Sequence, residues 1–318
     1  MKTKHVIATG ILSLLLLAVI WVGISYKRDM SVAKERIQAN SHIIETDCGP
    51  VEYAEAGTGK PVLVIHGAGG GYDQGLLLGR ALLGREYRVI APSRYGYLNA
   101  GIPQDHSLEA QADAFACLLD ELGIERVPVI SVSAGGIPSM YFALRYPERT
   151  EALVLVSAVS YTEETSEDYA KEDGIKRLVS SDFVYWAAVR STPASMLKLF
   201  GVTEEVQAKM SPTDKEYANE VLDVMLPMSL RWEGILLDQS RQIGKDLPLT
   251  QIQIPTLVIH AQDDTLVALS HGEYSAGQIP GAELITLEDG GHFLLGHNEE
   301  VYKSVTSFLS KSTIAADY

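Results

Sequence analysis

Along most of the chain, short apolar runs alternate with stretches in which apolar residues recur at helical spacing. Runs such as PVLVI and ALVLV contain no polar side chain, which is typical of parallel strands buried on both faces. The alternation predicts an α/β fold with a doubly wound, mostly parallel sheet that helices cover on both faces. The predicted strands cover residues 51–56, 61–66, 87–92, 127–132, 152–159, 256–260 and 283–287, and the predicted helices cover 74–83, 107–122, 137–145, 269–278 and a last segment that ends near 309.

This alternation stops between residues 160 and 253. The segment contains helical stretches rich in Met, Trp and Phe but no convincing strand. Because the strands on either side of it need one another to complete the sheet, we interpret it as a helical cap inserted into one domain. The predicted catalytic domain therefore covers residues 41–318, with a cap at about 160–253.

The N-terminal segment, residues 1–40, has a different pattern. Residues 6–25 carry no charge, and as a helix this run would cross a hydrocarbon core of about 30 Å. We therefore predict a single-pass membrane anchor, followed by a polar linker over residues 31–41. Basic residues flank the run on both sides, so the side of the membrane on which the body lies stays open.

A cleaved signal peptide is the alternative, because Lys2 and Lys4 precede the apolar run. Two features favour retention. The run is longer than the roughly 7 to 15 residues of a signal's apolar region, and no A-x-A-like site precedes the charged stretch at 26–29. A buried core helix is the least favoured interpretation. If cleavage did occur, the body would be secreted.

Composition agrees with a globular hydrophobic core, since 46% of residues are hydrophobic and 21% are charged. The net charge is -15, and the chain after residue 40 carries -19. Such an acidic body argues against nucleic-acid binding and against electrostatic binding to anionic lipids. Cys48 lies in an early polar stretch and Cys117 in a predicted amphipathic helix, and from these positions we predict that they are unpaired, partly buried thiols.

A turn of small residues follows the predicted strand 127–132. It reads Ser131-Val132-Ser133-Ala134-Gly135-Gly136 and opens a helix. In a sharp strand-to-helix turn, small residues two positions either side of the apex expose the apex side chain, here Ser133, as a nucleophile. The usual pattern is G-x-S-x-G, and Ser131 replaces its first glycine. Alone, the segment also fits an ordinary helix N-terminus.

A serine nucleophile needs a base and a carboxylate that orients the base. Asp264 follows the predicted strand 256–260, and His292 follows the strand 283–287. Because the carboxyl ends of parallel strands meet at one edge of the sheet, we expect both near Ser133. Asp263 and His297 are the neighbouring alternatives. Asp264 is favoured because it lies deeper in its loop, and His292 because His297 falls further into the last helix.

A glycine-rich loop, His66-Gly67-Ala68-Gly69-Gly70-Gly71, ends the strand 61–66. We assign the stabilisation of an oxyanion to the backbone N–H groups of Ala68 and Ala134. The loop does not match a phosphate-binding pattern, because residue 72 is Tyr and no G-K-[ST] follows. His66 is predicted to form structural hydrogen bonds. The sequence shows no His or Cys spacing typical of a metal site, so we expect neither metal nor cofactor.

On these motifs the chain resembles the α/β-hydrolase fold superfamily, in particular its esterases and lipases. The resemblance covers about residues 42–311 and implies the triad Ser133, Asp264 and His292, with the helical insertion as a cap over the active site. The chain departs from the pattern at Ser131 and at APSRYGYLNA (91–100), where relatives usually have an Asp-containing loop. The motifs that carry the resemblance are HGAGGG (66–71), SVSAGG (131–136), AQDDTLV (261–267) and GGHF (290–293).

From these features we expect a serine hydrolase that cleaves carboxylic esters through an acyl-enzyme intermediate. Its substrate would be a small-molecule ester with an apolar acyl or alcohol part. Carbon–carbon bond hydrolases and lactonases share the serine arrangement and stay open, whereas dehalogenases and epoxide hydrolases use Asp at the turn. A different class of function is a non-catalytic ligand-binding sensor that keeps the hydrolase fold.

Overall fold

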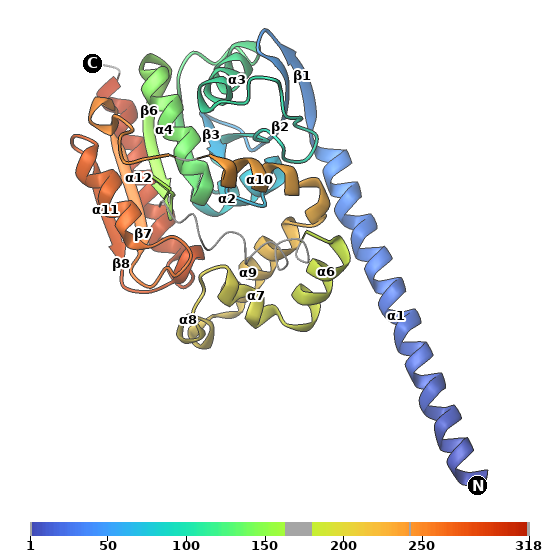
Figure 1. The fold of residues 1–318 in the computed structure, drawn as a ribbon. Coiled ribbons are helices and arrows are strands. Elements are labelled where there is room, and N and C mark those ends of the chain that lie inside the picture. The colour runs from blue at the N-terminus through green and yellow to red at the C-terminus, as the bar shows by residue number, and fades with distance from the viewer. Residues whose placement is uncertain (1, 163–179, 242, 317–318) are drawn as a thin grey trace.

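The computed structural model describes residues 2–162, 180–241 and 243–316 (Figure 1). In this part of the chain, one eight-stranded sheet has the order β1-β2-β4-β3-β5-β6-β7-β8. Both pairings of β2 are antiparallel, and all neighbours from β4 to β8 are parallel. This confirms the predicted fold class. The strands are β1 (His42–Thr46), β2 (Gly49–Ala56), β3 (Pro61–Ile65), β4 (Arg88–Pro92), β5 (Val127–Val132), β6 (Thr150–Val156), β7 (Thr256–Ala261) and β8 (Glu283–Leu287).

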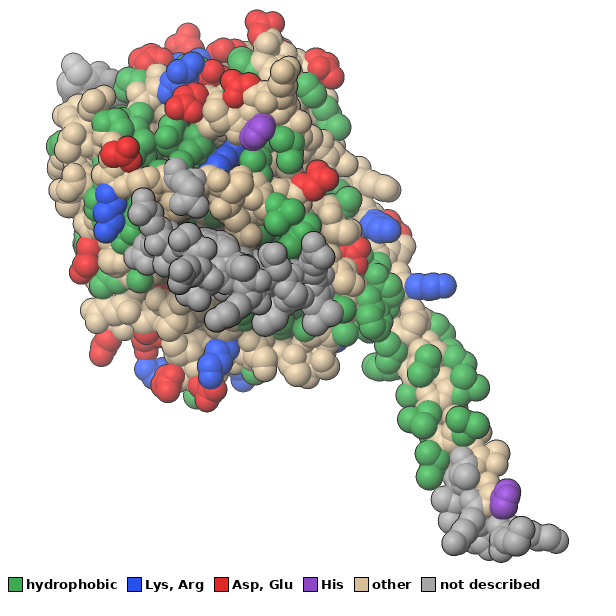
Figure 2. Space-filling view, viewed as in Figure 1, with side chains coloured by type: hydrophobic (Ala, Val, Ile, Leu, Met, Phe, Trp, Pro, Cys, Tyr) green, Lys and Arg blue, Asp and Glu red, His purple; other side chains and the backbone are tan. Residues whose placement is uncertain are grey.

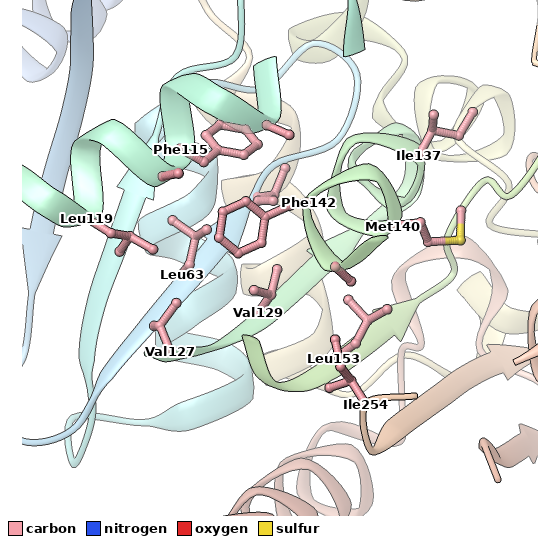
Figure 3. Close-up of a cluster of buried hydrophobic side chains, with 14 of the residues drawn as sticks. Leu63, Phe115, Leu119, Val127, Val129, Ile137, Met140, Phe142, Leu153 and Ile254 are labelled. Atoms are coloured by element: carbon pink, nitrogen blue, oxygen red, sulfur yellow. The ribbon is translucent and has the colours of Figure 1, made fainter. Parts of the chain in front are cut away.

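Helices cover both faces of the sheet, and each face has its own hydrophobic cluster. On one face, Phe115 and Phe142 pack with Leu63, Val129 and Leu153 of the central strands (Figure 3). The runs that read as continuously apolar are thus buried from both sides. The first face carries α3 (Leu108–Glu121), α4 (Gly136–Arg145) and α11 (Leu269–Gln278), and the second carries α2 (Tyr72–Leu83) and α12 (Asn298–Ala316).

In its described residues, the insertion between β6 and β7 consists of helices and loops and contains no strand. We call residues 182–240, which include the helices α6 to α10 and the segments between them, the cap. Part of the predicted cap, residues 163–179 and 242, lies outside the described residues. The cap helices are α6 (Asp182–Ser191), α7 (Pro193–Leu199), α8 (Glu204–Lys209), α9 (Pro212–Val224) and α10 (Trp232–Ser240).

The described residues also form short 3-10 helices along the chain. These are η1 (Ser133–Gly135), η2 (Pro147–Arg149), η3 (Met228–Leu230), η4 (Leu249–Gln251) and η5 (Gly291–Phe293).

The N-terminal helix α1 (Lys2–Asn40) projects away from the body, on the side where α6 lies (Figure 1). Apolar side chains surround its projecting part (Figure 2). The helix is long and apolar enough to cross a membrane, with a mean hydropathy of 2.1 in its most apolar window, none of which is buried. Its other end packs on the body. Met30 and Ala33 lie in one hydrophobic cluster with cap residues, and Ile37 is also buried. The predicted linker over residues 31–41 was therefore wrong, because an apolar face at helical spacing docks this segment as helix.

The two cysteines form a disulfide, with the Cα atoms of Cys48 and Cys117 separated by 6.1 Å. The prediction of unpaired thiols was wrong. Cys48 lies in the turn between β1 and β2, and Cys117 lies on α3, which packs against this hairpin. The pairing depends on β1, which the sequence pattern did not predict.

Candidate active site

Ser133 occupies a strained turn at the carboxyl end of β5. Its φ angle is 54°, in the left-handed region that serine seldom adopts. The carbonyl of Ser133 accepts a hydrogen bond from the Val159 N–H at 2.9 Å, which fixes the turn against the chain after β6. A Cβ on Gly135 would lie 2.6 Å from the His66 carbonyl oxygen, so this position needs glycine. The sequence pattern of small residues thus corresponds to close backbone contacts.

Ser131, the departure from the usual motif, is fully buried beside this turn. Its Oγ lies 2.8 Å from the Oγ of Ser139, and Ser139 in turn donates a hydrogen bond to the Gly136 carbonyl at 2.7 Å. The extra hydroxyl therefore has a partner in α4, and the sharp turn forms without a glycine at this position.

Asp264 and His292 contact each other at the same edge of the sheet. The Nδ1 atom of His292 lies 2.7 Å from Oδ2 of Asp264, and the Asp264 side chain is fully buried. The other carboxylate oxygen accepts hydrogen bonds from the N–H groups of Leu266 and Val267, both at 2.9 Å. Burial alone would raise the pKa of Asp264, but hydrogen bonds from His260 and His292 lower it below its usual range. The carboxylate is therefore held in its charged form.

The neighbouring alternatives lie in other contacts. Asp263 accepts a hydrogen bond from the Gly291 N–H at 2.8 Å through Oδ1. His297 lies between Asp289 and Glu300, at 3.0 and 3.1 Å, where it is partly exposed. The structure therefore brings together Asp264 and His292, and places Asp263 and His297 around the loop that carries His292.

The glycine-rich loop after β3 lies directly against Ser133. A Cβ on Gly67 would lie 3.0 Å from the Cβ of Ser133. The Gly67 carbonyl accepts hydrogen bonds from His66 Nδ1 at 2.7 Å and from Arg94 Nη2 at 3.1 Å, and the Gly67 N–H donates to Gln74 at 2.9 Å. Burial, and then the charge of Arg94, lower the pKa of His66 well below its usual value. A neutral His66 thus forms part of the loop's hydrogen-bond network.

Three residues that the sequence analysis did not assign also contact this site. His260 is fully buried, and its Nε2 lies 2.8 Å from the Val267 carbonyl and 3.4 Å from Asp264. Arg94 and Arg231 are buried, and each contacts a carbonyl of the glycine-rich loop. The position of His260, a polar residue at the end of the apolar strand that precedes Asp264, was a usable signal. The two arginines pair with residues more than 140 positions away, which no local pattern reveals.

Ser133 and His292 line one cavity of about 110 Å³ between the sheet edge and the cap. Among the described residues that line it there is no Asp, Glu, Lys or Arg. Across the described ranges, no cluster of three or more His, Cys, Asp or Glu side chains is arranged to hold a metal ion. The cavity is therefore suited to uncharged, apolar groups. Its apolar wall includes Leu78 and Leu82 of α2, Phe200, Val221 and Met225 of the cap, and Phe293.

A family model for the alpha/beta hydrolase fold matches residues 60–298, which is most of the chain. The chain therefore belongs to the α/β-hydrolase fold family. It is 33% identical over 266 residues to an uncharacterized hydrolase of Bacillus subtilis, covering 79% of this chain and 91% of the relative. It is 26% identical over 271 residues to a 2-hydroxy-6-oxo-2,4-heptadienoate hydrolase of Pseudomonas putida, with 80% and 91% covered. Among solved structures, an alpha/beta hydrolase fold protein of Nakamurella multipartita superimposes with a TM-score of 0.72 at 27% identity, covering 85% of this chain and 98% of that one.

Proposed function

We propose that the protein is a serine hydrolase that cleaves carboxylic esters through an acyl-enzyme intermediate. In this proposal Ser133 is the nucleophile, His292 the general base and Asp264 the group that orients His292. The observation that carries the proposal is the buried hydrogen bond between Asp264 and His292 beside the cavity that Ser133 also lines. Order along the chain and position at strand ends support the same assignment.

The hydrogen bond sets the chemistry of the histidine. With Nδ1–H donated to Asp264, the Nε2 atom of His292 is the one left to accept the proton of the Ser133 hydroxyl. Ser133 Oγ then attacks the ester carbonyl, and the imidazolium returns its proton to the departing alcohol. Water, deprotonated by the same histidine, attacks the acyl-enzyme and releases the carboxylic acid.

The oxyanion would be stabilised by the backbone N–H groups of Ala68 and Ala134. In a planar trans peptide the C=O and N–H groups point in opposite directions. The Gly67 carbonyl faces His66 and Arg94, so the Ala68 N–H of the same peptide points away from them. The Ser133 carbonyl faces the Val159 N–H, so the Ala134 N–H likewise points away from Val159. Both alanines line a second cavity of about 230 Å³, and Ala68 also lines the cavity of Ser133 and His292.

A second candidate function is carbon–carbon bond hydrolysis, which the similarity to the Pseudomonas putida enzyme supports. We favour ester hydrolysis because the cavity of Ser133 and His292 has no charged lining among its described residues. The substrate group that enters it is therefore uncharged and apolar.

A substrate panel distinguishes these functions. We expect sustained release of p-nitrophenol from p-nitrophenyl esters of increasing acyl length, and slower turnover of a 2-hydroxy-6-oxo-dienoate. The Ser133→Ala variant, assayed at the same concentration, should have lost the ester activity. Faster turnover of the dienoate would favour the second function, and binding of both classes without turnover would indicate a sensor.

We also propose that the projecting part of α1 anchors the protein in a membrane. Its length and apolar surface support this, and its docked end, residues 26–40, would stay on the body even if a signal peptide were removed before it. The Cys48–Cys117 disulfide supports a body on the oxidising, extracytoplasmic side, where disulfides persist.

A further inference from the structure

The loop that would bind the oxyanion is held from the cap side as well as from the sheet. Building on the proposed function, we propose that helix α10 of the cap positions this loop, residues 67–71, through two ion pairs whose arginines are buried. One pair joins Asp238 to Arg94, and the other joins Arg231, which immediately precedes α10, to Asp73. Each pair includes an arginine that donates to a carbonyl of the loop.

The first ion pair is hydrogen-bonded to the start of the loop. Arg94 is 1% exposed, and its Nη1 and Nη2 atoms donate to the two carboxylate oxygens of Asp238 at 2.6 and 2.8 Å. The same guanidinium donates from Nε to the His66 carbonyl and from Nη2 to the Gly67 carbonyl, both at 3.1 Å. The peptide whose N–H belongs to Ala68 is therefore fixed by a side chain whose own orientation depends on Asp238.

The second ion pair is hydrogen-bonded to the end of the loop. Arg231 is fully buried and binds both oxygens of Asp73, at 3.0 and 2.7 Å, while its Nη1 donates to the Gly70 carbonyl at 2.5 Å. Asp73 lies in the first turn of α2, which directly follows the loop. Arg36 of α1 approaches the same carboxylate, at 3.4 Å, so the docked end of α1 shares this contact.

In the two ion pairs the cap contributes charges of opposite sign, so together the pairs define the position of α10 on the catalytic domain. The cap supplies the carboxylate to one pair and the guanidinium to the other. Arg94, Arg231 and Asp73 are buried, whereas Asp238 is partly exposed. A shift or tilt of α10 would separate buried charges and pull on the carbonyls of Gly67 and Gly70, on either side of Ala68. A displacement near 1 Å in such a site costs about 10²-fold in rate, so α10 acts on the reaction through the loop. These are positioning residues, since neither pair touches the reacting atoms.

A third ion pair between the cap and α2 offers a matched control. Arg80 of α2 pairs with Glu220 of α9, and both side chains are substantially exposed. This pair also crosses from the catalytic domain to the cap, but neither side chain has a described contact with a carbonyl of the loop. Loss of this pair reports the general effect of weakening cap attachment.

The test compares Asp238→Asn and Asp73→Asn with Glu220→Gln in the full chain. We expect both Asn variants to lose about 10-fold in kcat with little change in KM, because oxyanion donors act on the transition state. Their affinity for an alkyl trifluoromethyl ketone, which forms a tetrahedral adduct with the serine, should fall in parallel. Glu220→Gln should keep wild-type kcat and wild-type inhibitor affinity.

A fourth variant covers the case in which an Asn variant does not fold. Arg94→Lys keeps a positive charge opposite Asp238 but lacks the fork that reaches the His66 and Gly67 carbonyls, so it should show the same loss in kcat. The proposal is overturned if the folded variants at Asp238, Asp73 and Arg94 all match Glu220→Gln in kcat and inhibitor affinity. Ser133→Ala in the same assay separates the two claims, because residual turnover there would refute the proposed nucleophile instead.

Discussion

Asp263 and Asp264 are adjacent carboxylates that contact different groups. Asp264 is buried and bonded to His292, with two backbone N–H groups on its other oxygen. Asp263 binds only the Gly291 N–H among the contacts described for its side chain. In the proposed mechanism this difference makes Asp264 the residue that orients the imidazole, and Asp263 a support of the loop on which the imidazole lies.

Substitution by asparagine tests this difference. We expect Asp264→Asn to reduce kcat by about 10⁴-fold, because the amide cannot hold the tautomer that leaves Nε2 free to accept a proton. Asp263→Asn should stay close to wild type, because its amide oxygen still accepts the Gly291 N–H. The measurement is kcat on a p-nitrophenyl ester, with thermal unfolding as the check on folding. Equal losses in both variants would contradict the assignment of Asp264.

Local patterns at strand ends predicted that Asp264 and His292 lie close together. Asp264 and His292 each follow an apolar run, and the structure places them in contact. The side chains that support them were not predictable in this way. Arg94 and Asp238 are 144 positions apart, and their pairing depends on how the cap folds back over the sheet edge.

Among the elements, the β1–β2 hairpin is tied to α3 by the Cys48–Cys117 disulfide. This hairpin forms the edge of the sheet, where β1 is only partly buried and has one neighbouring strand. A covalent link between residues 69 positions apart restricts the unfolded chain strongly. The disulfide therefore stabilises an edge that packing alone holds weakly.

We predict that replacing both cysteines by alanine lowers the free energy of unfolding by about 4 kcal/mol, as expected for a loop of this length. Thermal unfolding with and without a reductant measures this change. Reductant should lower the unfolding temperature of the wild type and leave that of the double variant unchanged. A wild type insensitive to reductant under unfolding conditions would contradict the role of the disulfide.

The elements that sequence analysis missed share a physical cause. The strand β1 is a short edge strand with a mixed pattern, so its apolar signal is weak. The helical docking of residues 31–40 includes contacts with the cap, although the spacing of the buried Met30, Ala33 and Ile37 was a signal that the sequence contained. Both depend on tertiary packing against distant parts of the chain, whereas the buried strands are recognisable from their own residues.

At the scale of the whole molecule, α1 combines two parts with different surroundings. Its first part exposes apolar side chains such as Leu12, Leu16 and Trp21, each more than half exposed. Its last part is bonded to the body, where Trp186 and Arg190 of the cap both donate to Asp29. One continuous helix therefore connects the proposed membrane anchor to the cap.

We predict that the full chain sediments with membranes and that a variant lacking residues 2–25 is soluble and keeps its esterase activity, because the docked part of α1 remains. Protease added to sealed, right-side-out vesicles should digest the body of the full chain. Recovery of the full chain as a soluble protein without its first 25 residues would indicate a cleaved signal peptide.

The central claim, that Ser133 forms an acyl-enzyme beside the Asp264–His292 pair, is tested most directly by locating the covalent adduct. The protein is reacted with a p-nitrophenyl ester, quenched in acid during the initial burst of p-nitrophenol, and digested for mass spectrometry. We predict an acyl group on Ser133 in the wild type, and neither an adduct nor a burst in Ser133→Ala. An adduct on another residue, or undiminished turnover by Ser133→Ala, would contradict the proposed mechanism.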